Sequence, residues 1–104
     1  MVKVVGNGKG GRNLEMVLGG VKKLSNKNVV FASLTTDGID GNCEAAGAIA
    51  DKYTYIKSQK KGLEPKKFLK DNNSYDFFKA LGDLLITNKT GTNVMDIQIL
   101  IKTK

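Results

Sequence analysis

The sequence predicts an α/β fold, namely a single three-layer domain with a mixed, mostly parallel sheet flanked by helices. The first observation is length, because 104 residues fit one small domain. The second is that segments with helical spacing of apolar residues alternate with short runs typical of strands. The third is that no run approaches the roughly 18 consecutive apolar residues of a membrane-spanning helix. We therefore expect residues 1–104 to form one domain outside the membrane.

The first half of the chain is expected to contain two strands and two helices. A short strand at residues 2–5 is followed by a glycine-rich loop. Apolar residues in the segment 12–24 recur at helical spacing, whereas residues 29–34 are typical of a buried strand. A loop with two Asp-Gly pairs follows at residues 35–42, and the alanine-rich segment 43–51 predicts the second helix.

The second half is expected to continue the alternation. Its predicted elements are a short strand at 53–56, a helix at 65–70, a helix at 75–85, a polar loop at 87–93 and a closing strand at 97–101. In α/β sheets, ligands bind outside the carboxyl ends of the strands, so the loops after the first two strands are natural site loops. An antiparallel closing strand would bring the polar loop before it to the same edge of the sheet.

The composition excludes several kinds of site. Cys43 is the only cysteine and there is no histidine. An internal disulfide, a thiolate zinc cluster and a histidine general base are therefore ruled out. Residues 1–5 show no apolar block followed by a cleavage site, so no secretory signal is expected. A reducing, cytoplasmic location is the simplest interpretation.

The net charge of +7 indicates an anionic partner only weakly. Many lysines lie between Lys52 and Lys70, where a solvated face is the simplest interpretation. A nucleic-acid surface normally adds arginines and stacking aromatic residues. Arg12 is the only arginine among the 17 basic residues, so no nucleic acid is expected.

The glycine-rich loop lies between the first strand and the first helix. Gly6, Gly8 and Gly11 have the spacing of a dinucleotide-binding motif. The acidic residue that such a motif requires about 20 residues later has only Asp37 as a candidate, beyond the following strand. The pattern is compatible with dinucleotide binding, with a general anion site at a helix N-terminus, or with a plain flexible turn.

The start of the first helix carries the charges of this loop. Lys9, Gly10 and Gly11 precede Arg12, whose guanidinium could hold a phosphate or a carboxylate through two parallel hydrogen bonds. An ordinary surface arginine is the alternative. Glu15 lies in the first turn, where it could complement the helix dipole or form an ion pair with Arg12.

The loop after the second strand contains Thr36, Asp37, Gly38, Asp40 and Gly41. Its two carboxylates could bind a magnesium ion beside phosphates, or one of them could accept a hydroxyl proton. The alternative is a structural one, with an Asx-turn and a helix cap.

Two further polar segments are candidates for binding. Asn73 and Ser74 can cap the helix that follows them. Thr90, Thr92 and Asn93 belong to a hydroxyl-rich loop that could cradle an anion or form a turn.

Four motifs together carry a resemblance that none carries alone. They are Gly10-Gly11-Arg12-Asn13-Leu14-Glu15, Thr36-Asp37-Gly38-Ile39-Asp40-Gly41 with Ala45-Ala46-Gly47-Ala48, Asn73-Ser74-Tyr75 with Phe77-Phe78, and Thr90-Gly91-Thr92-Asn93-Val94 with Asp96. In sequence and in order they resemble the MOFRL domain, the C-terminal part of glycerate 2-kinases, some of which are labelled hydroxypyruvate reductases. The resemblance covers essentially the whole chain, with Leu14 in place of a usual glutamine.

The resemblance implies a phosphoryl transfer from ATP to the 2-hydroxyl of D-glycerate, with magnesium. Arg12 would stabilise phosphate charge or hold the glycerate carboxylate, and Asp37 or Asp40 would position the hydroxyl or the metal. The remaining motif residues would bind substrate or support those that do: Lys9, Gly10, Gly11, Asn13, Glu15, Thr36, Gly38, Gly41, Asn73, Ser74, Thr90, Thr92, Asn93 and Asp96. Phosphoryl transfer depends on positioning and charge compensation, so the absence of histidine is no obstacle.

The resemblance also implies a partner. In that family the site lies between this domain and a larger N-terminal domain, so the chain is expected to be inactive without it. An apolar edge left uncovered could drive self-association. Two alternatives stay open: a nicotinamide-dinucleotide-binding fragment of a reductase, and a non-catalytic basic binding module.

Overall fold

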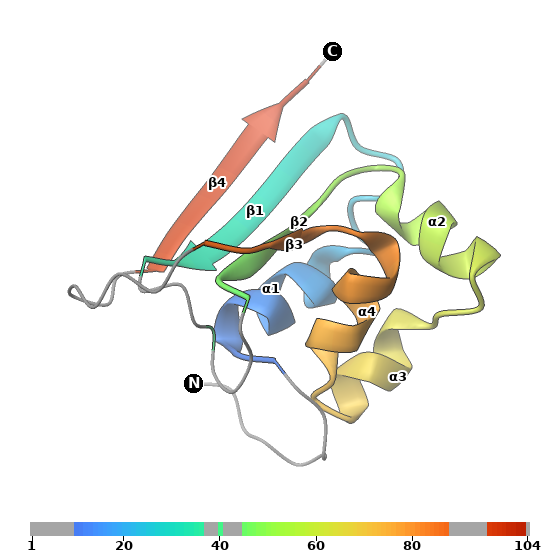
Figure 1. Ribbon diagram of the computed structural model, residues 1–104. Coiled ribbons are helices and arrows are strands. Elements are labelled where there is room, and N and C mark those ends of the chain that lie inside the picture. The colour runs from blue at the N-terminus through green and yellow to red at the C-terminus, as the bar shows by residue number, and fades with distance from the viewer. Residues whose placement is uncertain (1–9, 37–39, 41–44, 88–95, 104) are drawn as a thin grey trace.

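The computed structural model describes residues 10–36, 40, 45–87 and 96–103 (Figure 1). In chain order its elements are α1 (Arg12–Gly20), β1 (Val29–Thr35), β2 (Gly47–Ala50), α2 (Thr54–Lys60), α3 (Pro65–Lys70), α4 (Ser74–Leu81), β3 (Leu84–Leu85) and β4 (Asp96–Lys102). The strand predicted at residues 2–5 lies outside the described residues. No helix within the described part of the chain is both long enough and apolar enough to span a membrane.

The sheet has the strand order β3-β2-β1-β4, and each neighbouring pair is antiparallel. The prediction of a mostly parallel sheet is therefore wrong. Parallel neighbours need a crossover of a dozen or more residues, usually a helix. Only residues 36–46 connect β1 to β2, and the segment 43–51, predicted as the second helix, supplies β2 itself.

The alanine-rich segment 43–51 was predicted as a helix, and this prediction is wrong because Gly47–Ala50 forms β2. Its small side chains fit a crowded position. A Cβ on Gly47 would lie 1.8 Å from the backbone oxygen of Ser33. Ala48 and Ala50 are buried in the core. Tertiary packing thus overrides the helix propensity of alanine.

The prediction of a strand at residues 53–56 is also wrong, since α2 begins at Thr54. Local side-chain bonds explain the difference. The Tyr53 N–H donates to Asp51 Oδ1 at 2.9 Å, and the Asp51 N–H donates to Thr54 Oγ1 at 2.9 Å. These bonds give backbone N–H groups at the helix start side-chain partners, and so favour a helix where β-propensity alone favours a strand.

The other predicted elements are confirmed with small changes of length. They are α1, β1, α3, α4 and β4. The helix expected over 75–85 ends at Leu81, because Gly82 adopts a left-handed conformation with φ of 76°. The residues after it form β3, a short strand that the sequence did not predict.

The described helices gather on one face of the sheet, so the layering has two parts and not three (Figure 1). α1 packs against β1 and β2, and α3 and α4 pack against α1. The core between these layers contains Leu14, Val17 and Leu18 of α1 together with Phe77 and Phe78 of α4. This packing fixes the start of α1 beside the end of β1, where the candidate site lies.

Candidate functional site

The antiparallel pairing of β4 with β1 brings two distant segments to one edge of the sheet. Asp96, the first residue of β4, is the register partner of Thr35, the last residue of β1. The start of α1 lies at the same place, because Arg12 and Asn13 both contact Asp96. The closing strand is antiparallel, so its first residue lies at the edge where β1 ends. The polar loop expected over 87–93 lies mostly outside the described residues.

Arg12 and Asp96 form an ion pair at this edge. The Nε of Arg12 lies 2.5 Å from Oδ2 of Asp96, and the two side chains are 59% and 29% exposed. Hydrogen bonds from Arg12 and then from Asn13 lower the pKa of Asp96 below its ordinary value of 3.8. The carboxylate is thus held ionised and orients a guanidinium that solvent can reach.

Asn13 connects the ion pair to the interior. Its Nδ2 donates to Asp96 Oδ1 at 3.0 Å and to Asp40 Oδ1 at 3.2 Å. Its Oδ1 accepts the hydroxyl proton of Ser33 at 2.6 Å. Asn13 is 2% exposed, so its bonds to Asp40 and Ser33 are buried, whereas its bond to Asp96 is partly buried. Asn13 therefore joins α1, β1, β4 and the Asp40 loop in a single network.

Asp40 acts as a cap for α1, supplied from a different part of the chain. Its Oδ1 accepts the Asn13 N–H at 3.2 Å, and its Oδ2 accepts the Leu14 N–H at 2.8 Å. These are donors of the first helical turn, which have no partner within the helix. The carboxyl is buried, and a Cβ on Gly11 would lie 2.6 Å from its Oδ1. Asp40 therefore caps α1, whereas the cap expected in its loop belonged to a following helix that the structure replaces by β2.

Glu15 pairs with Asn72, whose Nδ2 donates to Glu15 Oε1 at 2.9 Å. Burial raises the pKa of Glu15 above 4.5; the Asn72 hydrogen bond opposes that rise and the Asp40 charge adds to it. The ion pair that the sequence suggested between Glu15 and Arg12 is replaced by Arg12–Asp96. Glu15 thus ties α1 to the segment before α4.

The end of the glycine loop packs on the start of α4. A Cβ on Gly10 would lie 2.1 Å from Ser74 Oγ, and Gly10 has a φ of +153°. Ser74 is fully buried, and its hydroxyl has no hydrogen-bond partner within the described residues. Asn73 beside it donates from Nδ2 to Asp76 Oδ2 at 3.0 Å. The first and third predicted motifs are therefore neighbours in space.

Residues 1–96 of the chain match the model of the MOFRL family. The chain belongs to the MOFRL family. A glycerate 2-kinase from Pyrococcus horikoshii is 46% identical over 96 residues, which are 92% of this chain and 22% of that protein. A putative hydroxypyruvate reductase from Agrobacterium vitis is 40% identical over 95 residues, 90% of this chain and 22% of that protein. The chain thus spans under a quarter of the length of these relatives.

A solved structure shares the fold closely. The crystal structure of glycerate kinase from Thermotoga maritima superposes with a TM-score of 0.94 at 43% identity. The similarity covers 99% of this MOFRL chain and 25% of the Thermotoga chain. The same antiparallel architecture is therefore part of a much longer protein there.

Some predicted site residues of the MOFRL chain lie outside the described residues. They are Lys9, Asp37, Gly38, Gly41, Thr90, Thr92 and Asn93. Thr36 is described and half-buried just after β1. In the described ranges, no group of three or more acidic, cysteine or histidine side chains gathers at one place. The proposed Asp37–Asp40 metal pair thus stays a prediction, with Asp40 already engaged by α1.

Two buried residues that hydrogen-bond to predicted site residues were not themselves predicted from the sequence. Ser33 is fully buried in β1 and donates to Asn13. Asn72 is buried, has a φ of 53° and holds Glu15. A serine inside a strand that is otherwise apolar was the available signal for Ser33, because a buried hydroxyl needs a partner.

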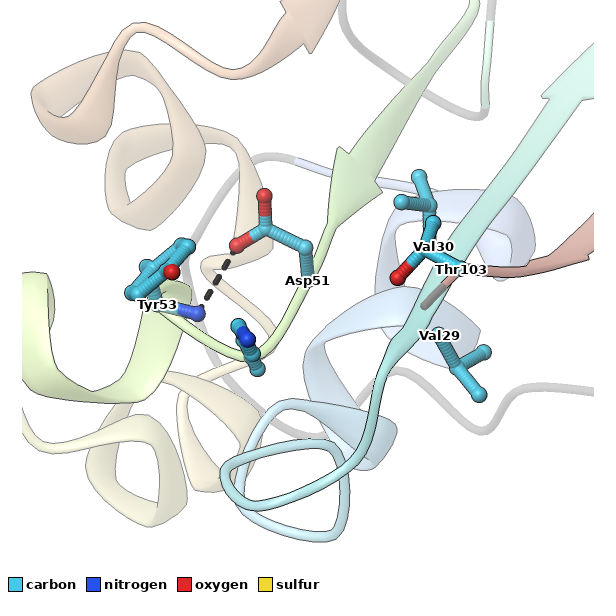
Figure 2. A pocket seen from close by; sticks show the side chains of 6 residues that line it. Val29, Val30, Asp51, Tyr53 and Thr103 are labelled. Atoms are coloured by element: carbon cyan, nitrogen blue, oxygen red, sulfur yellow. Dashed lines mark hydrogen bonds between the residues drawn. The ribbon is translucent and has the colours of Figure 1, made fainter.

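A pocket of about 290 Å³ lies at the other end of the β1–β4 pair (Figure 2). It is lined by Val29, Val30, Asp51, Lys52, Tyr53 and Thr103. Figure 2 shows the Tyr53 N–H directed at the Asp51 carboxylate, the bond that starts α2. No predicted site residue lines this pocket, so it is separate from the Arg12 edge.

Proposed function

We propose that this chain supplies one wall of the interdomain site of an ATP-dependent glycerate 2-kinase. In that reaction the 2-hydroxyl oxygen of D-glycerate bonds to the γ-phosphorus of ATP while the bond to the bridging oxygen of ADP breaks. The hydroxyl proton leaves and 2-phosphoglycerate forms. The chain would be inactive without the larger N-terminal part of such an enzyme.

The observation that supports this proposal best is Arg12 held at the sheet edge by Asp96. The guanidinium is oriented through Nε at 2.5 Å, and its side chain is 59% exposed. An oriented, accessible arginine suits the charge that develops on a transferring phosphoryl group or the carboxylate of glycerate. Arg12 is therefore our candidate for direct contact with substrate.

The surrounding residues fit positioning roles. Asn13 bridges Asp96 and Asp40, and Ser33 fixes the amide of Asn13. Asp40 holds the first turn of α1 through two backbone N–H groups. Each bond constrains the residue that carries or orients the guanidinium, and such control matters because small displacements of a reacting group cost rate.

The described residues are better suited to bind the phosphates of ATP than to bind magnesium. Arg12 suits a phosphate. Asp40 is a poor magnesium ligand as it stands, because both of its oxygens accept helix N–H groups. Mg²⁺ is usually bound by one or two carboxylates together with substrate phosphates. In this proposal magnesium would neutralise phosphate charge, and we assign no step to a metal bound by Asp40.

The test is an assay of ADP release on a hybrid chain. In the hybrid, this sequence replaces the matching 25% of the Thermotoga maritima glycerate kinase. ADP release should require both D-glycerate and the hybrid, and this chain alone should give none. A folded hybrid without glycerate-dependent ADP release, beside an active Thermotoga parent, would overturn the proposal.

A nicotinamide-dependent reductase is the second candidate. It is favoured by the glycine spacing and by the name of the Agrobacterium vitis relative. Oxidation of NADH by the same hybrid in the presence of hydroxypyruvate would support it. The dinucleotide motif argues against this candidate, because its acidic residue about 20 residues later has only Asp37 as a candidate, beyond the following strand.

A further inference from the structure

One face of the sheet is left uncovered by the described residues. Ser33 bonds to Asn13 of α1, and Gln98 lies 2.9 Å from the Met16 sulfur of α1, so these residues point to the helices. Side chains alternate along a strand, so their neighbours point to the opposite face. We call that surface the open sheet face: Val30, Ala32, Leu34, Ile49, Ile97, Ile99 and Ile101.

The pairing gathers these side chains into one patch. Ile97, Ile99 and Ile101 lie opposite Leu34, Ala32 and Val30 in the β1–β4 ladder. Ile49 lies opposite Ala32 on the other side, in the β1–β2 ladder. The patch is therefore continuous across three strands, and Figure 1 shows that no labelled helix covers this side.

The side chains of the open sheet face are unusually apolar for a surface exposed to water. An antiparallel sheet with one solvated face normally places polar residues there. None of the described strand residues that point to this face is charged, although 26% of the chain is charged. Ile97, Ile99 and Ile101 are 39%, 43% and 53% exposed. Contiguous exposed apolar residues on an edge strand mark an interaction surface.

We propose that the open sheet face is the docking surface for the rest of a glycerate kinase, carried on the same or on a separate chain. This inference rests on the function proposed above. The Thermotoga structure contains this fold with a TM-score of 0.94 as only 25% of its length. The remainder of such a protein is the occupant that this size relationship indicates. A docked surface that is apolar and free of charge matches the core of a permanent interface.

Docking at this face would also act on the site. Asp96 and Ile97 are consecutive in β4, so one points to Arg12 while the next points to the open sheet face. A partner that packs on Ile97 and Ile99 therefore fixes the strand that orients the guanidinium. The same partner borders the edge where Arg12 is exposed. This arrangement explains how one domain can complete a site held by the other.

Cysteine labelling tests the surface without relying on activity. In a Cys43→Ser background, Ile99→Cys reports on the open sheet face. Ile56→Cys on α2 is the matched control, because Ile56 is 48% exposed and Ile99 is 43% exposed. Labelling is followed by mass spectrometry of the peptide that contains each thiol. The two positions should react at similar rates in this chain alone at low concentration.

In the folded hybrid with the Thermotoga kinase, labelling of Ile99→Cys should slow by at least about tenfold, because it then requires opening of the interface. Ile56→Cys should keep its rate. Equal labelling of both positions, or a hybrid that cannot fold beside a stable parent, would overturn the proposal. Protection of Ile99→Cys in this chain alone would also overturn it, and protection that grows with concentration would identify a second copy as the occupant.

The hybrid's ADP release separates this proposal from the proposed function. Protection of Ile99→Cys without kinase activity would support the proposed docking surface and contradict the proposed function. Kinase activity without protection of Ile99→Cys would support the proposed function and contradict the proposed docking surface.

Discussion

Arg12 Nε and Asp96 Oδ2 lie 2.5 Å apart although 84 residues separate them in the sequence. The first belongs to the start of α1 and the second to the start of the last strand. Because the pairing of β4 with β1 places Asp96 there, the oriented guanidinium exists only after the sheet has closed. The ion pair thus links the fold directly to the candidate site.

Replacement of Arg12 by alanine should strongly lower turnover while leaving the fold intact. Loss of one preorganised charge-stabilising group costs roughly 100–1,000-fold in kcat, and the 59% exposure of the side chain limits the structural cost. The measurement is kcat of the hybrid kinase with D-glycerate. Lys57→Ala is the control, because it breaks the other described ion pair, Lys57–Asp83. Equal activity of Arg12→Ala and Lys57→Ala would refute the role of Arg12.

Removal of the Asn13 amide should destabilise the chain. Asn13→Ala leaves the buried Ser33 hydroxyl without its acceptor and removes the hydrogen bond to Asp96 Oδ1. A buried polar group left without its partner costs about 1–3 kcal/mol. Urea unfolding of Asn13→Ala, Ser33→Ala and the double variant measures the coupling. Additive losses would show that the two side chains do not act as one network.

Gly47→Ala should be among the most damaging small substitutions in the chain. The added Cβ would lie 1.8 Å from the Ser33 carbonyl oxygen and 2.7 Å from the Leu34 Cα, both rigid backbone atoms of the paired strand. Gly19→Ala is the control, because its Cβ would meet nothing within 4 Å. Gly19 is inside α1, so its replacement should stabilise the chain by about 0.5–1 kcal/mol. Thermal unfolding compares them, and equal effects would contradict the packing of β2 on β1.

The stability of the chain should carry a pH dependence from Glu15. Burial raises the Glu15 pKa above 4.5, so the folded chain binds this proton more tightly than the unfolded chain does. Its contribution to stability is therefore present below pH 4.5 and is lost as the pH rises through the folded pKa. Glu15→Gln removes this loss and keeps an acceptor for Asn72.

Urea unfolding across this window measures the effect. The free energy of unfolding of the wild type should fall relative to Glu15→Gln as the pH rises. Glu64→Gln, at an exposed glutamate, is the control. A constant difference between wild type and Glu15→Gln would show that burial does not perturb Glu15.

The sequence predicted those parts of the fold that depend on local patterns. The apolar spacing of Leu14, Val17 and Leu18 predicted α1, and Gly82 explains where α4 ends. The sequence failed at β2, because crowding against Ser33 selects small residues that also favour helices. Strand direction could not be predicted either, since it depends on which segment forms the crossover.

The sequence identified several residues of the candidate site but not the roles that they have in the structure. The motif around Arg12 and the late Asp96 were chosen from the resemblance, and the structure brings the two together. Asp40 was proposed as catalytic or metal-binding, and the structure places it on the first turn of α1. A cap contributed from 26 residues away leaves no local sequence signal. Ser33 did have a local signal, a hydroxyl inside an apolar strand, but its partner Asn13 lies on another element.

ADP release by the folded hybrid kinase, measured with and without D-glycerate, tests the central claim most directly. The account predicts glycerate-dependent ADP formation that this chain alone does not show and that Arg12→Ala lowers by roughly 100–1,000-fold. A folded hybrid that forms no ADP with D-glycerate, while the Thermotoga parent does, would contradict it.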